Sequence, residues 1–341
     1  MKRSCLAIVF VLSAICLALF GQTAGYHLLK KIPFPAAEGG GEYFDYITFD
    51  PASRRVYLSH GTEVLVEEAD SGALAGKITG LKRCHGVLLV PDLGRGFITD
   101  GDAAEIVMFD IKTLKTIGRI KGEKDADAIR YDPASKHIFV FNGDPHSATV
   151  IDPAKGTVVA TLPLGGAPEQ AAVDGKGMIY DNLEDTNEVI AIDSRALKIT
   201  ARWPVAPAGA PTSMAMDAAH RRLFIGGRNP GVLVVMDAGT GQITGQPFPI
   251  GKRVDSNIFD PETGLIACST GDGTIHIFHE DAPDKFSEVQ TVRTEPGAKT
   301  MALDPKTHNL LVDTSDFQPA AQGQRQPRAV PGTFRLLIYG R

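Results

Sequence analysis

Short apolar runs recur along the chain, and each leads into a turn signal rich in Asp, Pro, Gly or Asn. The most regular marker is an apolar residue followed by Asp and often Pro, as in Phe49-Asp50-Pro51. Corresponding positions then follow at intervals of 40 to 44 residues, at Val90, Asp132, Asp174, Asp217, Asp260 and Asp304. A period of this length is typical of a repeat architecture.

Each repeat holds four strand-length segments separated by turn residues. In the unit that begins near Asp132, the second, third and fourth segments are 137–141, 148–152 and 158–162. Their alternation of apolar and polar residues is blurred, as expected for sheets that are covered on both faces. Four short strands at this period predict one blade of a β-propeller.

Seven markers predict an all-β fold, a seven-bladed β-propeller of four-stranded blades. The last unit has only three strands, whereas a spare strand at 27–34 precedes the first marker. Because an open ring leaves unpaired edges, we expect the N-terminal strand to close the ring by pairing beside 334–339 in the C-terminal blade. The expected blades cover about 42–81, 82–123, 124–166, 167–209, 210–252, 253–297, and 298–341 together with 26–34.

A known family shares this pattern. The segment 148–168, ATVIDPAKGTVVATLPLGGAP, resembles the YVTN repeat of YncE-like β-propellers. The resemblance extends over roughly residues 26–341, and it implies the propeller fold and export from the cytoplasm. It implies no particular activity, since one fold hosts many functions. The WD dipeptide and the kelch signature are absent.

The N-terminus reads as a targeting segment. Two basic residues precede an apolar run at 6–20, and small residues follow, which is the order of a secretory signal peptide. We predict that residues 1–25 are removed by cleavage near Ala24 or Gly25, because the run is too short for a membrane span. A lipoprotein signal at Cys16 is the alternative. The mature protein is expected to be secreted or periplasmic.

Composition narrows the function classes. The chain has 341 residues, 43% of them hydrophobic and 22% charged, with a net charge of −5. This is ordinary globular composition without a basic block, which argues against disorder and nucleic-acid binding. Cys84 and Cys268 lie outside any CxxC motif and on blades that are not neighbours, so we expect no haem attachment and no disulfide. A single tryptophan argues against PQQ, and no nucleotide loop is present.

An ionisable residue stands five positions before the marker in six of the seven repeats. These positions hold Asp45, His85, Asp127, Glu169, Thr212, Asp255 and Lys299. Because the innermost strand of each blade lines the central channel, we predict that these side chains form a ring around one channel mouth. A second tier of predicted ligand-binding residues follows the markers by about ten positions on the same face: His60, Asp100, Asn142 and Asn182.

This ring suggests a cation site. Four carboxylates around one mouth repel one another, and Lys299 offsets only one of the charges. Oxygen ligands favour Ca²⁺ or Mg²⁺, whereas a neighbouring His85 suits Zn²⁺. The candidate metal ligands are Asp127, Glu169 and Asn182. The plainer interpretation is that the aspartates satisfy loose backbone N–H groups where the strands begin.

Two classes of function fit these residues. The first is a monomeric binding module that holds a small polar ligand or divalent metal, or docks another exported protein, at the channel mouth. The second is a metal-dependent hydrolase of the gluconolactonase type, an analogy at the level of fold. There a metal would polarise a lactone carbonyl, and His85 or Asp255 would be the catalytic base. A propeller lyase is a further alternative.

One segment interrupts the repeat. Residues 315–332 replace a connection that takes roughly five residues in the other blades. Long connections in a compact domain are usually functional or disordered. Two interpretations stay open, a lid or partner loop that carries Arg325 and Arg328, and an idle insertion rich in Pro and Gln.

Overall fold

The computed structural model describes residues 25–319 and 327–341. Nearly all of the predicted signal peptide, with Cys16 and Ala24, lies outside the described residues, as does Arg325. No helix in the described part of the chain has the length and apolarity needed to cross a membrane.

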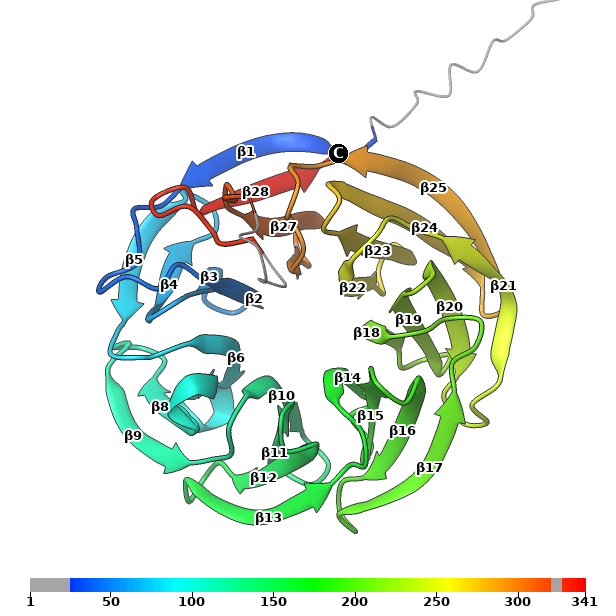
Figure 1. The fold of residues 1–341 in the computed structure, drawn as a ribbon, viewed down its shortest axis with the longest axis horizontal. Coiled ribbons are helices and arrows are strands. Elements are labelled where there is room, and N and C mark those ends of the chain that lie inside the picture. The colour runs from blue at the N-terminus through cyan, green and yellow to red at the C-terminus, as the bar shows by residue number, and fades with distance from the viewer. Residues whose placement is uncertain (1–24, 320–326) are drawn as a thin grey trace, which may run out of the picture.

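The described chain forms seven four-stranded antiparallel sheets arranged as a ring (Figure 1). The innermost strands are β2 (Phe44–Asp50), β6 (Cys84–Val90), β10 (Ala126–Asp132), β14 (Pro168–Val173), β18 (Pro211–Asp217), β22 (Val254–Asp260) and β26 (Met301–Asp304). The second strands are β3 (Arg55–His60), β7 (Arg95–Asp100), β11 (His137–Asn142), β15 (Met178–Leu183), β19 (Arg222–Arg228), β23 (Leu265–Thr270) and β27 (Asn309–Thr314).

The outer half of each blade continues this order. The third strands are β4 (Glu63–Glu68), β8 (Glu105–Asp110), β12 (Ser147–Asp152), β16 (Glu188–Asp193), β20 (Gly231–Asp237), β24 (Thr274–Ala282) and β28 (Arg335–Gly340). The outermost strands are β5 (Ala73–Ile78), β9 (Thr116–Lys121), β13 (Thr157–Pro163), β17 (Lys198–Pro204), β21 (Ile243–Pro249), β25 (Lys285–Arg293) and β1 (His27–Pro33). Two short 3-10 turns lie in the second blade, η1 (Pro91–Leu93) and η2 (Gly101–Ala103).

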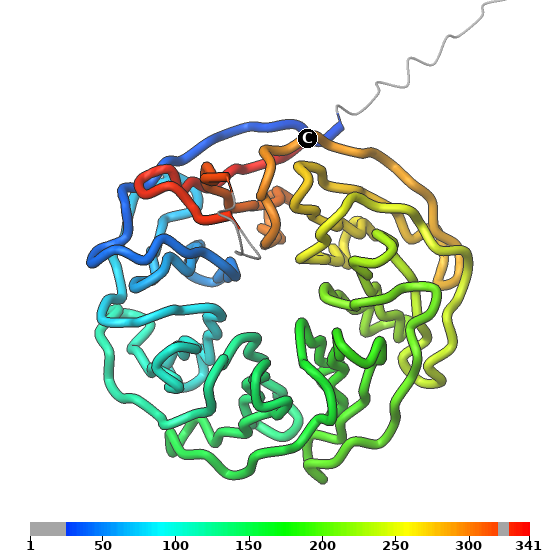
Figure 2. The backbone as a smooth tube through the Cα atoms, in the orientation of Figure 1, coloured from blue at the N-terminus to red at the C-terminus, as the bar shows by residue number. Residues whose placement is uncertain are grey.

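The N-terminal strand closes the ring, as predicted. β1 pairs antiparallel with β28, from His27 opposite Gly340 to Pro33 opposite Arg335. The blue and red ends of the chain therefore lie side by side in one blade (Figure 2). The last sheet has the order β1-β28-β27-β26, so it takes strands from both ends of the chain.

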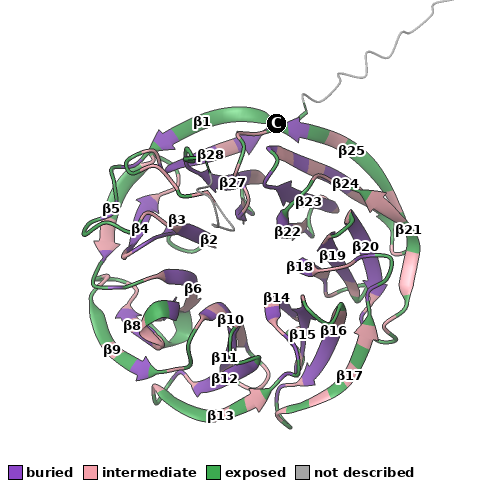
Figure 3. Ribbon diagram, in the orientation of Figure 1, coloured by how far each residue is buried: buried purple, intermediate pink, exposed green. Residues whose placement is uncertain are grey.

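Seven apolar clusters fill the seven seams between neighbouring blades. The second and third strands are therefore mostly buried, whereas the outermost strands face solvent on one side (Figure 3). Burial on both faces explains why the alternation along these strands is blurred in the sequence. Both cysteines are buried in these seams and form no disulfide, as predicted.

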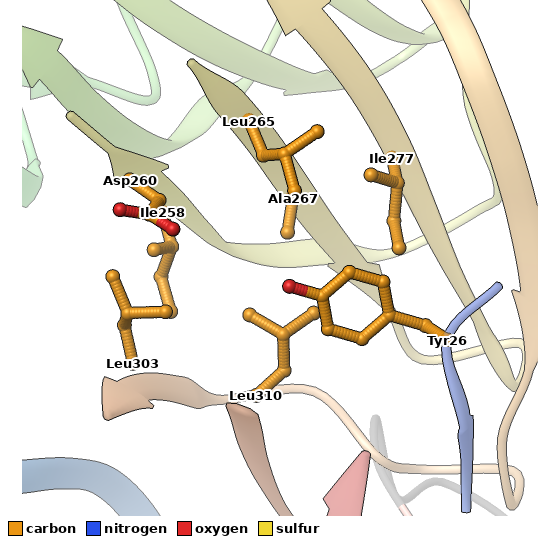
Figure 4. Close-up of a pocket in the computed structure, with 8 residues that line it drawn as sticks. All are labelled: Tyr26, Ile258, Asp260, Leu265, Ala267, Ile277, Leu303 and Leu310. Atoms are coloured by element: carbon orange, nitrogen blue, oxygen red, sulfur yellow. The ribbon is translucent and has the colours of Figure 1, made fainter. Parts of the chain in front are cut away.

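The chain preceding β1 also packs into a seam. Tyr26 lies against Leu265, Ile277 and Leu310, between the sixth and seventh blades (Figure 4). Its hydroxyl donates a hydrogen bond of 2.7 Å to the carbonyl of His308. The space left beside the ring is about 10 Å³, roughly the room of one water molecule. This contact is part of the core.

Candidate functional site

The predicted ring residues stand where the innermost strands begin. In six blades the residue lies inside a β-bulge, as at Asp45 between Phe44 and Ile47, and His85 between Cys84 and Val87. The same irregularity recurs in the third to sixth blades. A bulge adds an unpaired residue and re-aims its side chain, so the repeat turns these side chains toward one mouth.

Three adjacent blades bring Asp45, His85 and Asp127 into one cluster. His85 Nδ1 is 2.8 Å from Asp45 Oδ2 and 3.2 Å from Asp127 Oδ1. A single N–H cannot point at both carboxylates, and Asp127 Oδ1 accepts no hydrogen bond from any described residue. The Tyr43 hydroxyl donates to Asp45 Oδ2 at 2.7 Å and completes the cluster.

The two carboxylates determine the charge of His85. Burial alone would lower the pKa of the imidazole, but Asp127 and Asp45 outweigh it and raise that pKa to about 10. Burial likewise opposes ionisation of Asp45, but Lys299 and His85 lower the pKa of this carboxyl. At neutral pH His85 is therefore an imidazolium that neutralises its acidic neighbours.

The far side of the ring is compensated by two other cations. Lys299 Nζ is 3.0 Å from Asp255 Oδ2 and 3.8 Å from Asp45 Oδ1. Arg228 donates to Asp255 and lies 3.2 Å from Glu184. Arg228 was missed by the sequence analysis, although it stands at the end of β19, eleven positions past Asp217 and one past the second-tier spacing.

Glu169 is different from the other acidic ring residues. It has no ion pair within 4 Å among the residues that the structure covers, whereas Asp45, Asp127 and Asp255 each have one. Burial raises the pKa of Glu169 well above its usual value, and the Asp127 charge adds to this rise. Burial also raises the pKa of Asp127. These two residues, on neighbouring blades, form the acidic side of the mouth.

The second tier turns away from the ring. His60 stacks on Phe334 with ring centroids 4.4 Å apart, and its Nε2 lies 2.7 Å from Glu42. The Asp100 carboxylate accepts hydrogen bonds from backbone N–H groups of the preceding loop. The Asn142 amide donates to Ser147 and Thr149. These three residues are fully buried within their blades.

The structure groups different metal-type ligands from those expected. Asn182 is fully buried and donates to the carbonyl of Ser213 at 3.1 Å. At the channel mouth, Asp45, His85 and Asp127 have ligand atoms within 4.8 Å of one another, and Glu169 lies outside this group. None of the carboxylates of Asp45, Asp127 and Asp255 accepts a backbone hydrogen bond among the described residues.

Below the ring the channel narrows to a small polar cavity of about 120 Å³. All seven innermost strands line it. Arg130 and Gln170 are among its polar side chains. Arg130 donates to a backbone carbonyl of the adjacent fourth blade, and Gln170 donates to one of the sixth blade. The cavity holds a few waters at most, so a larger ligand has to bind at the mouth above it.

The base of the inserted segment lies beside this mouth. Phe317 bridges to Ala329 as a short antiparallel pair, and the Phe317 ring lies 6.0 Å from that of Phe44 at the start of β2. Arg335 pairs with Asp316 at 2.8 Å. The middle of the insertion, 320–326, is outside the described residues, so the lid interpretation stays a prediction.

Comparisons with known proteins identify the fold. No family model matches the chain, and no curated protein matches it in sequence. A chain in the crystal structure of the mitotic checkpoint complex superposes with a TM-score of 0.73 over 100% of this chain and 99% of that one, at 14% identity. In all, 1713 solved chains match, so the fold cannot discriminate between functions. The chain is a seven-bladed β-propeller, and its place in the YncE-like family stays a prediction.

Proposed function

We propose that this protein is an exported, YncE-like propeller that binds a small polar ligand through a positively charged group at the channel mouth. One observation carries the proposal. Glu169 is the only one of the four ring carboxylates without a cation within 4 Å in the described part of the chain. A partly buried carboxylate without an ion-pair partner is destabilised by its lost hydration, and a ligand cation beside Glu169 and Asp127 would remove that cost.

The remainder of the ring favours a ligand with both donors and acceptors. Lys299 and Arg228 stand on the opposite side with Asp255, and Arg83 lies over the Tyr43 ring at 4.3 Å. An amine-bearing polar molecule can meet both sides, whereas a bare divalent ion would use the acidic side alone. A basic segment of another exported protein could place a Lys or Arg side chain beside the same carboxylates.

The proposal predicts that Glu169→Gln loses affinity for the ligand. The variant is expected to weaken binding of the recognised ligand about tenfold or more, since a charged partner is removed. The free variant should melt at a higher temperature, because an unpaired, partly buried charge is gone. Thermal shift with amino acids, polyamines, Ca²⁺, Mg²⁺ and Zn²⁺ identifies the ligand class, and calorimetry then measures the loss.

Glu262→Gln is the matched control, because Glu262 is an exposed carboxylate, 72% accessible, in a turn far from the ring in the repeat. It should leave both binding and melting temperature unchanged. Equal affinity of Glu169→Gln and the parent protein for every ligand that shifts the melting temperature would refute the assignment of the acidic side.

A metal-dependent hydrolase is the second candidate, and the Asp45–His85–Asp127 group favours it. A divalent ion there would take the place of the His85 proton and could polarise a lactone carbonyl. The catalytic bases expected from the sequence fit this less well. His85 holds its proton at neutral pH, and Asp255 is paired with two cations.

A lactone panel with and without added Zn²⁺, Mn²⁺ or Ca²⁺ separates the two candidates. The binding proposal predicts no turnover above the buffer rate under any of these conditions. Metal-dependent hydrolysis that disappears in Asp127→Asn would establish the enzyme instead. Turnover that survives this variant would place the chemistry away from the cluster.

A further inference from the structure

A second group of metal-type ligands lies on the opposite face of the ring. Asp217 ends β18 in the fifth blade, His220 follows in the turn, and Glu280 projects from β24 of the sixth blade. His220 Nδ1 is 2.5 Å from Asp217 Oδ2 and 3.7 Å from Glu280 Oε1. All three ligand atoms lie within 4.8 Å of one another.

The repeat shows that Glu280 is unusual at its position. Leu265 at the start of β23 pairs with His279, as Met178 at the start of β15 pairs with Asp193. Glu280 is therefore the equivalent of Ser194, whose hydroxyl donates to Asp132 of the preceding blade at 2.6 Å. In the fourth blade, Ser194 therefore donates a hydrogen bond to the marker aspartate of the preceding blade. In the sixth blade, the equivalent residue is a second carboxylate beside Asp217.

One oxygen of the Glu280 carboxylate lacks a hydrogen-bond partner among the described residues. The Glu280 side chain is only 4% exposed, and the buried Oε1 atom accepts no hydrogen bond. Burial, followed by the Asp217 charge, raises the pKa of Glu280 to about 7. The Arg222 charge acts on Glu280, but this guanidinium is already engaged by Asp237 and Asp284. Two adjacent buried acids thus share one half-exposed histidine.

We propose that Asp217, His220 and Glu280 bind a divalent transition-metal ion, with Zn²⁺ the best match, across the seam between the fifth and sixth blades. One imidazole nitrogen and two carboxylates form a ligand set for Zn²⁺, whereas Ca²⁺ and Mg²⁺ prefer oxygen alone. His220 is 51% exposed, so solvent reaches the site and water can complete the coordination. The ion supplies the charge that the blades lack there and ties them together.

The test uses tag-free protein and ZnCl₂, with binding measured by calorimetry and stability by melting temperature. Zn²⁺ is expected to bind the parent protein and raise its melting temperature, since binding to the folded state alone stabilises it. Glu280→Ser introduces the residue that the fourth blade has at the equivalent position, and His220→Ala changes a half-exposed turn residue. Both variants should therefore fold. Each is expected to lose about tenfold or more in affinity for Zn²⁺ at this site.

His279→Ala is the matched control, because His279 is a neighbouring, partly exposed histidine that pairs with Asp281. It should bind Zn²⁺ like the parent protein. Asp127→Asn removes a ligand from the cluster at the mouth, so it separates zinc bound there from zinc bound at the seam. No Zn²⁺ binding by the parent protein, or equal binding by Glu280→Ser and His220→Ala, would overturn the proposal.

Discussion

A chain that lacks residues 26–34 is expected to lose the cooperative unfolding transition of the intact protein. Tyr26 packs in the seam between the sixth and seventh blades, and Ile32 and Phe34 pack in the seam between the seventh and first. Burial of each such side chain contributes about 1.5–3 kcal/mol. Their summed loss, about 4.5–9 kcal/mol, is comparable with the whole stability of a typical domain, about 5–15 kcal/mol.

The deletion also exposes the outer edge of β28, which pairs with β1 along its length. Exposed edges promote association, so the truncated chain should aggregate as well as unfold. Circular dichroism during thermal melting and light scattering measure the two effects. Leu28→Ser with Leu29→Ser is the control, because both leucines are exposed and the strand pairing stays intact. A truncated chain with the same melting temperature as this control would contradict closure as the source of stability.

His85→Gln is expected to destabilise the protein at neutral pH by about 3–5 kcal/mol, the usual cost of removing one partner of a buried ion pair. His85 is 4% exposed and lies between Asp45 and Asp127. The folded pKa of about 10 exceeds the ordinary value of about 6.5. The stabilisation is therefore complete below pH 6.5 and is lost as the pH rises through 10.

Denaturant unfolding of the parent protein and His85→Gln at pH 6.5, 8 and 10 measures this effect. The difference between the two free energies of unfolding should shrink steadily as the pH rises, because other titrating groups cancel in the difference. A control at a histidine outside the cluster, His279→Gln, should show no such trend. A constant difference across the range would mean that His85 carries no extra proton in the folded state.

The repeat in the sequence predicts some residues of the channel mouth and misses others. The bulged position at the start of each inner strand recurs with the period, so Asp45, His85 and Asp127 could be grouped before any coordinates were known. Arg228 reaches the ring from the neighbouring second strand, and its spacing differs by one residue from the second tier. Asn142 and Asn182 share that tier, but Asn142 donates to Ser147 and Thr149 of its own blade, and Asn182 donates to the Ser213 carbonyl of the next blade.

The sequence alone determined the number of blades, the strand order and the closing role of the N-terminal strand. Period and strand-forming composition are local properties, and sheet edges have to be paired in a closed ring. Only the tertiary structure decided which charges neutralise one another, that His85 is protonated, and that Glu280 lies beside Asp217 with one oxygen that accepts no hydrogen bond. These outcomes depend on burial and on neighbours from other blades, and Coulomb interactions at a few ångströms vary too steeply with distance to be inferred from spacing along the chain.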